Sequence, residues 1–145
     1  KATKRMGWEV SSVKPETKLT KVAKWTEKNR IACVPVCDSS NYLVGVITDR
    51  DIILRSLACD KQAQNTTASE IMTCNVCTCN QDDDVKNAEK KMAENQIRRI
   101  PVVDNNKVVG ILTLGDLAKY SQKTGQENFS NTFEEICDCG HKNNR

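Results

Sequence analysis

The sequence has few aromatic side chains, which make up 4% of its 145 residues. This scarcity argues against a protein that binds nucleic acid by stacking bases on aromatic rings. The formal net charge is only +3 and the isoelectric point is about 8.4, whereas dedicated nucleic-acid binders usually have isoelectric points above about 9. We therefore expect no nucleic acid among the partners of this chain.

Long apolar runs are also missing from the sequence. No stretch approaches the ~20 apolar residues that a membrane-spanning helix needs. The basic residues between Lys1 and Arg5 are not followed by an apolar segment, which a secretory signal would require. These two absences favour a cytoplasmic location and argue against a membrane partner.

Catalytic motifs are absent as well. The single histidine is His141, near the end of the sequence. A serine elbow, a glycine-rich phosphate loop and a catalytic cysteine–histidine pair are not found in the sequence. We therefore predict that the chain is not an enzyme.

The sequence does contain an internal repeat. Residues 31–38 (IACVPVCD) are echoed by residues 97–104 (IRRIPVVD), and residues 44–51 (VGVITDRD) are echoed by residues 109–116 (VGILTLGD). A duplicated unit of this kind usually builds a two-fold symmetric body. Ligand clefts tend to form where two such halves meet.

Each copy is predicted to contain a strand, a helix, two strands and a second helix. The opening extended pieces are expected at 8–13 and 76–79, and the second helices at 51–58 and 116–121. Apolar stripes with helical spacing mark the first helices. These stripes consist of Leu19, Val22, Ala23 and Thr26 in copy one, and of Val85, Ala88 and Met92 in copy two.

Local signals refine this prediction. Pro15 and Thr17 stand where the first helix should start, and acidic residues at 82–84 suit the N-terminus of the helix in copy two. Pro35 and Pro101 lie inside predicted hairpin strands, which implies an edge strand or a ladder position left free on one side. Residues 60–70 are expected to form a polar linker, and residues 131–137 one more helix.

The eight cysteines are explained by the repeat better than by disulfide bonds. Cys37 stands where the other copy has Val103, and Cys79 stands where it has Val13. Cys74 falls opposite Trp8. Because reduced cysteine packs as a small apolar residue, we expect most of these thiols to be inert packing residues.

The motif that could carry chemistry is a glycine, a threonine three residues later and an aspartate three residues after that. It occurs as Gly45, Thr48 and Asp51, and again as Gly110, Thr113 and Asp116. Glycine in a strand lets another backbone or a ligand approach closely. The threonine hydroxyl at a helix start can bind a phosphate oxygen, and the aspartate can accept hydrogen bonds from ribose hydroxyls. The alternative is that both pairs only cap helices.

These motifs resemble those of a tandem pair of CBS domains, also called a Bateman module. The resemblance is carried by residues 33–36 with 45–52, by residues 100–104 with 110–116, and by the Ile71-Met72-Thr73 segment. It covers about residues 6–121. The family implies an α+β fold of two β-α-β-β-α repeats, at 6–62 and 63–122, packed with pseudo-two-fold symmetry. Residues 123–145 would form a partly helical tail.

The resemblance also implies a function. CBS pairs are regulatory modules that bind adenosine-containing ligands such as AMP, ADP, ATP or S-adenosylmethionine and act as energy or metabolite sensors. They often form homodimers, and their target here would be an unknown regulated protein. One ligand cleft would contain Thr48, Asp51, Thr73 and Ile100, and the other Thr113, Asp116, Gly7 and Val34. Arg50 and Arg99 would neutralise phosphate in the first cleft.

Two alternatives to a ligand sensor stay open. One is a dimerisation or interaction module with empty clefts, although Asp51 and Asp116 argue against it because neither carboxylate is needed for packing. The other is a cysteine-rich variant that binds zinc, for which four cysteine or histidine ligands would suffice. The zinc candidates are Cys74, Cys77 and Cys79, and the tail cluster of Cys137, Cys139 and His141. We expect no other cofactor.

Overall fold

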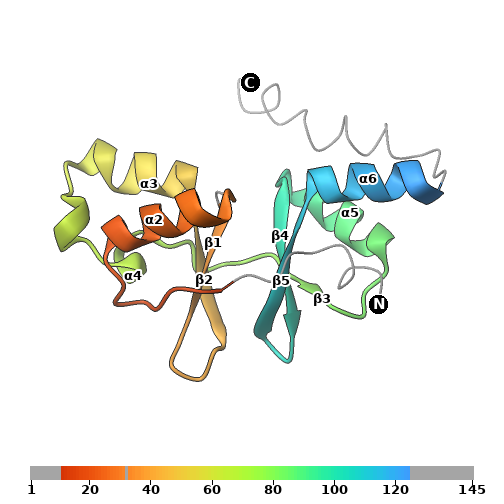
Figure 1. The fold of residues 1–145 in the computed structure, drawn as a ribbon, viewed down its shortest axis with the longest axis horizontal. Helices are drawn as coiled ribbons and strands as arrows, with labels where there is room; N and C mark the ends of the chain where they lie inside the picture. The colour runs from red at the N-terminus through yellow and green to blue at the C-terminus, as the bar shows by residue number, and fades with distance from the viewer. Residues whose placement is uncertain (1–10, 32, 125–145) are drawn as a thin grey trace. The chain divides into compact units, whose positions relative to one another are not determined.

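The computed structural model describes residues 11–31 and 33–124, and these residues form two compact units. The first unit comprises residues 11–76 and 106–108, and the second comprises residues 77–105 and 109–124. Helices and small sheets occur in both, so the predicted α+β class is confirmed (Figure 1). These units are defined by contacts, whereas the predicted boundary at 62/63 separates the two copies of the repeated sequence. That boundary stays a prediction.

The first unit is built around a hairpin. Its elements are α2 (Leu19–Asn29), β1 (Cys33–Cys37), β2 (Leu43–Thr48), α3 (Asp49–Arg55), the 3-10 turns η1 (Leu57–Cys59) and η2 (Ala63–Asn65), and α4 (Ala68–Ile71). Strands β1 and β2 are antiparallel, as predicted, with Val36 opposite Gly45. Val13 forms a parallel bridge to Val36 on the other side of β1. Helix α2 packs on β1, and α4 packs on β2.

The second unit contains a three-stranded sheet. Its elements are β3 (Cys79–Asn80), α5 (Val85–Asn95), β4 (Arg99–Asp104), β5 (Lys107–Thr113, whose first two residues belong to the first unit) and α6 (Leu114–Thr124). The strand order is β3-β4-β5, and β3 runs parallel to β4. The predicted stripe of Val85, Ala88 and Met92 is buried against Ile100 and Leu117, so this helix prediction is confirmed. Asp84 is the N-cap of α5 and accepts a hydrogen bond from the Lys86 amide at 3.4 Å.

The edge position predicted for the proline-containing strands is wrong. Strand β1 lies between Val13 and β2, and β4 is the central strand of its sheet. The missing proline N–H is tolerated because Val46, opposite Pro35, directs its amide and carbonyl to Thr73 instead. Pro101 lies outside the two residues of β4 that pair with β3. The other alternative that the prolines implied was a ladder position left free on one side, and it fits both Pro35 and Pro101.

Helix α2 differs from its predicted stripe. Ala23 is exposed, whereas Trp25 is buried together with Leu19 and Val22. The indole Nε1 of Trp25 donates to both the carbonyl and the hydroxyl oxygen of Ser11, each at 3.1 Å. Sequence reasoning missed Trp25 because it stands among lysines. The helix begins at Leu19, and its N-cap residue makes no side-chain capping bond.

The segment predicted as a polar linker is structured. It contains η2 and α4, and Thr66 and Ala68 are both buried. The Leu19 amide donates to the Thr66 carbonyl at 2.8 Å, which ties the segment to α2. The extended piece expected at 76–79 is short, since β3 begins only at Cys79. The piece at 8–10 and the helix at 131–137 lie outside the described residues.

The described cysteines are all free thiols. Cys33, Cys37 and Cys79 are buried, which confirms the apolar positions predicted for the last two. Burial raises the pKa of the Cys79 thiol to about 11 and also raises that of Cys77. The apolar position predicted for Cys74 is wrong, because its side chain is exposed in the connection between the two units.

None of the helices within residues 11–124 has both the length and the hydropathy that crossing a bilayer requires.

Candidate functional site

The site begins with a close backbone approach at Gly45 in β2. A Cβ atom on Gly45 would lie 2.7 Å from the Met72 Sδ and 3.0 Å from the Thr73 carbonyl oxygen. Next to it, Val46 and Thr73 exchange backbone hydrogen bonds of 3.0 and 2.8 Å. The sequence therefore needs glycine at position 45 because the segment after α4 lies directly against β2. This confirms the close approach predicted from the glycine.

Thr48 and Asp51 form a capping box at the start of α3. The Thr48 amide donates to the Asp51 Oδ2 at 2.9 Å, and the Asp51 amide donates to the Thr48 Oγ1 at 3.3 Å. Thr113 and Asp116 repeat this geometry at the start of α6, with distances of 2.9 and 3.1 Å. Both aspartates therefore have a structural role. The structure therefore shows the capping role that was the alternative, and ligand binding by either carboxylate stays a prediction.

Thr73 also contacts the Asp51 carboxylate. Its hydroxyl donates to both carboxylate oxygens, at 3.1 Å to Oδ1 and 3.2 Å to Oδ2. Asp51 is only 7% exposed. The structure thus brings together Thr48, Asp51 and Thr73 from β2, α3 and the segment after α4, three residues that were predicted to share a cleft.

Arg55 is a site residue that sequence reasoning missed. Its Nη1 donates to the Met72 carbonyl at 2.9 Å and to the Ile71 carbonyl at 3.4 Å. Its Nε lies 3.8 Å from the Asp51 Oδ1. The available signal was its position four residues after Asp51 on a predicted helix, which places both side chains on one face.

The other predicted site residues are distributed over both units. Val34 is buried in β1 of the first unit, and Arg50 is exposed on α3. Arg99, Ile100, Thr113 and Asp116 belong to the second unit, where Ile100 is fully buried. Gly7 lies outside the described residues. Each predicted cleft combines residues of both units, so the two complete sets stay predictions.

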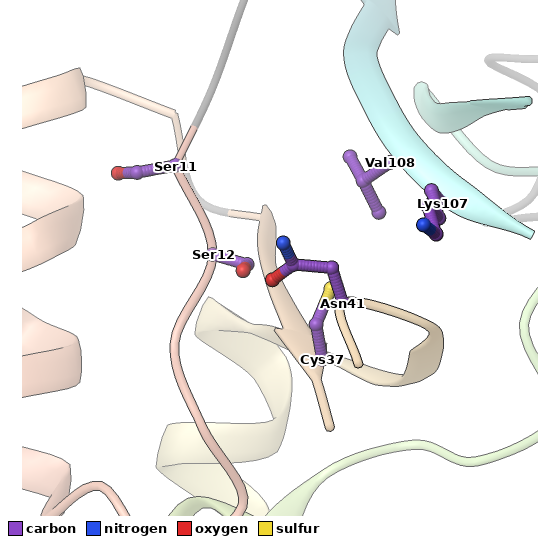
Figure 2. A pocket seen from close by; sticks show the side chains of 6 residues that line it. All are labelled: Ser11, Ser12, Cys37, Asn41, Lys107 and Val108. Atoms are coloured by element: carbon purple, nitrogen blue, oxygen red, sulfur yellow. The ribbon is translucent and has the colours of Figure 1, made fainter. Parts of the chain in front are cut away.

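A polar cavity of about 380 Å³ lies at the hairpin turn of the first unit. Figure 2 shows the side chains that line it: Ser11, Ser12, Cys37, Asn41, Lys107 and Val108. The Lys14 ammonium holds the turn by donating to the Asp38 carbonyl at 2.8 Å and to the Asn41 Oδ1 at 3.4 Å. None of the predicted ligand-binding residues lines this cavity, and its lining contains no carboxylate.

The structure also bears on the metal alternative. Cys74, Cys77 and Cys79 do not form a metal-ligand group, and residues 11–31 and 33–124 contain no other cluster of three histidine, cysteine or acidic side chains. Cys137, Cys139 and His141 lie outside the described part of the chain.

Comparison with known proteins agrees with the geometry. The family model described as "CBS domain" matches residues 6–58 and 68–123. The CBS domain-containing protein YhcV of Bacillus subtilis is 37% identical over 113 residues, which are 78% of this chain and 79% of that protein. Hypoxic response protein 1 of Mycobacterium tuberculosis is 30% identical over 111 residues, which are 77% of this chain and 78% of that protein.

Solved structures show the same fold. The crystal structure of Hypoxic Response Protein I with two coordinated zinc ions superposes with a TM-score of 0.75 at 28% identity, over 81% of this chain and 97% of that one. The crystal structure of CBSX2 in complex with AMP superposes with a TM-score of 0.72 at 23% identity, over 86% and 98%.

Proposed function

Because this chain belongs to the CBS domain family and carries two matches to it, we propose that it is a regulatory module that binds an adenosine-containing ligand at Asp51. The observation that carries the proposal is a nearly buried carboxylate, at the start of a helix, whose neighbours are a hydroxyl and a guanidinium. A carboxylate can accept two hydrogen bonds from a ribose diol. CBSX2, which shares the fold, was crystallised with AMP.

Each predicted residue has a role in this proposal. Thr48 and Arg50 bind phosphate. The roles predicted for Ile100 and Arg99 concern the base and the phosphate, and these two residues belong to the second unit. Thr73 belongs to the ribose region and not to the base region, because its hydroxyl lies on the Asp51 carboxylate. The ligand acts by a population shift: it prefers one arrangement of the chain and thereby changes a surface that a regulated protein recognises.

Calorimetric titration with AMP, ADP, ATP and S-adenosylmethionine tests this function. Replacing Asp51 by alanine (Asp51→Ala) should weaken binding more than tenfold, or by more than ~1.4 kcal/mol. The matched control is Glu70→Ala, because the Glu70 Oε2 accepts from the Thr67 amide at 2.7 Å in an equivalent capping box on α4. The control should keep its affinity. Unchanged affinity in Asp51→Ala would remove the carboxylate from the ligand site.

A second candidate function, assembly without a ligand, is favoured by an apolar surface on α3 and η1. Ile53, Leu54 and Leu57 are 55, 48 and 67% exposed. Three large apolar side chains so close in sequence are typical of a contact surface. We propose that a second copy of the chain covers them in a homodimer.

Sedimentation velocity tests the homodimer. Leu57→Glu should shift the protein from dimer to monomer, whereas Ala23→Glu, at an exposed apolar position on α2, should leave the dimer intact. A monomeric wild-type protein would contradict the proposal. A Leu57-dependent dimer that binds none of the four ligands would identify the chain as an assembly module.

A further inference from the structure

We infer that the Thr73 hydroxyl competes with the ligand for Asp51, so that binding of a vicinal diol removes one of the contacts that hold residues 71–73 on the first unit and loosens this segment. This inference rests on the proposed function and adds a mechanism by which the site would report that it is occupied. It is carried by the hydrogen bonds that hold the carboxylate and by the position of Thr73 in the chain.

The Asp51 carboxylate is already nearly satisfied without a ligand. A carboxylate offers about four acceptor positions. The Thr48 amide uses one of them on Oδ2, at 2.9 Å. The Thr73 hydroxyl bridges both oxygens, and the Arg55 Nε lies beside Oδ1. A bridging hydroxyl occupies the position that a bidentate diol needs, because the diol must also reach both oxygens at once.

Competition at this position affects the chain itself, because Thr73 lies at the exit of the first unit. The second unit begins four residues later, at Cys77. Residues 71–73 are held by backbone bonds to Val46, by the Arg55 guanidinium and by the Thr73 hydroxyl. The hydroxyl is the only one of these groups that a ligand at Asp51 would displace directly.

The surroundings of Asp116 lack this arrangement in the sequence. Tyr120 stands four residues after Asp116, whereas Arg55 stands four residues after Asp51, and Gly7 of the first repeat corresponds to Thr73 of the second. Glycine supplies no hydroxyl and tyrosine supplies no guanidinium. The competition is therefore specific to the first unit.

Affinity for AMP and for 3′-deoxyadenosine monophosphate tests the inference, because only AMP has the complete diol. Thr73→Val removes the hydroxyl and keeps the side-chain shape. It should strengthen AMP binding by about threefold to tenfold, in keeping with the net contribution of one typical hydrogen bond. The deoxy analogue should gain less than about twofold. Thr73→Ser, which keeps the hydroxyl, should bind both ligands like the wild-type protein.

Hydrogen exchange at the amides of residues 72–74 provides the second measurement. In the wild-type protein, AMP should speed exchange at these amides, whereas a ligand that only rigidifies the site would slow it. Weaker or equal AMP binding by Thr73→Val, or slower exchange with AMP, overturns this inference and leaves the proposed function intact. Absence of binding of AMP, ADP, ATP and S-adenosylmethionine in both the wild-type protein and Thr73→Val overturns both.

Discussion

At the scale of single residues, Glu89 on α5 is a carboxylate whose environment disfavours its charge. Its Oε1 is buried and makes no hydrogen bond to any residue of the described ranges. Burial raises its pKa above the usual value of 4.5, opposed by Lys86 and reinforced by Asp84. Because the pKa is higher in the folded chain, the resulting stabilisation is present below about pH 4.5 and is lost as the pH rises through the folded value.

Replacing this carboxylate by its amide should therefore stabilise the protein at neutral pH. We expect Glu89→Gln to raise the free energy of unfolding at pH 7 by less than about 1 kcal/mol, since solvent screens a partly exposed group. The gain should shrink toward zero as the pH falls to 4. Urea unfolding at both pH values measures it. Glu94→Gln is the control, because Glu94 is exposed on the same helix; an equal gain there would refute the assignment to burial.

Whether the environment of a single residue could be predicted depended on the residue at the corresponding position of the other repeat. The positions of Cys37 and Cys79 were predicted correctly because the other copy has valine there, and valine reports an apolar site. Cys74 was predicted wrongly. Its counterpart Trp8 suggested an apolar position, but Cys74 lies in the connection between the two units, where its side chain is exposed. Glu89 gave no sequence signal, since the burial that raises its pKa is visible only in the structure.

At the scale of elements, α4 shows how a very short helix is held. It has only four residues, from Ala68 to Ile71, and an isolated helix of that length is unstable in water. Thr67 and Glu70 cap its N-terminus, and Arg55 donates to the carbonyls of Ile71 and Met72 at its C-terminus. Composition alone predicted a linker here. The pattern of Thr67 and Glu70 is a local capping signal, but Arg55 comes from α3, and its contacts could not be identified from local pattern.

Removing the C-terminal contact should weaken this region. We expect Arg55→Met, which keeps an apolar stem and loses the donors, to lower the free energy of unfolding by about 1–2 kcal/mol. Arg50→Met, at an exposed position on the same helix, should change it by less than about 0.5 kcal/mol. Thermal unfolding of both variants gives the comparison. Equal effects of the two substitutions would show that the Arg55 hydrogen bonds contribute no net stability.

At the scale of the whole molecule, the duplication predicted much of the candidate site. Two copies of one motif correctly indicated two capped helices, and the family resemblance correctly grouped Thr48 and Asp51 with Thr73. The sequence did not reveal the difference between the copies at Arg55 and Tyr120, because that difference gains meaning only once the contacts of Arg55 to residues 71–72 are known. The two repeats therefore have equal caps and unequal surroundings.

The different surroundings of Asp51 and Asp116 predict which of the two aspartates the stabilisation by AMP depends on. Asp51→Ala and Asp116→Ala each remove an equivalent capping box, which should cost about 1 kcal/mol of stability without ligand, and Asp51→Ala also removes the hydrogen bonds from Thr73. AMP at 100 times its dissociation constant should raise the free energy of unfolding by about 2.7 kcal/mol in the wild-type protein. Chemical denaturation should show that Asp116→Ala keeps most of this increase and that Asp51→Ala loses half of it or more. The reverse result would place the AMP site in the second repeat, since the capping losses cancel in the comparison.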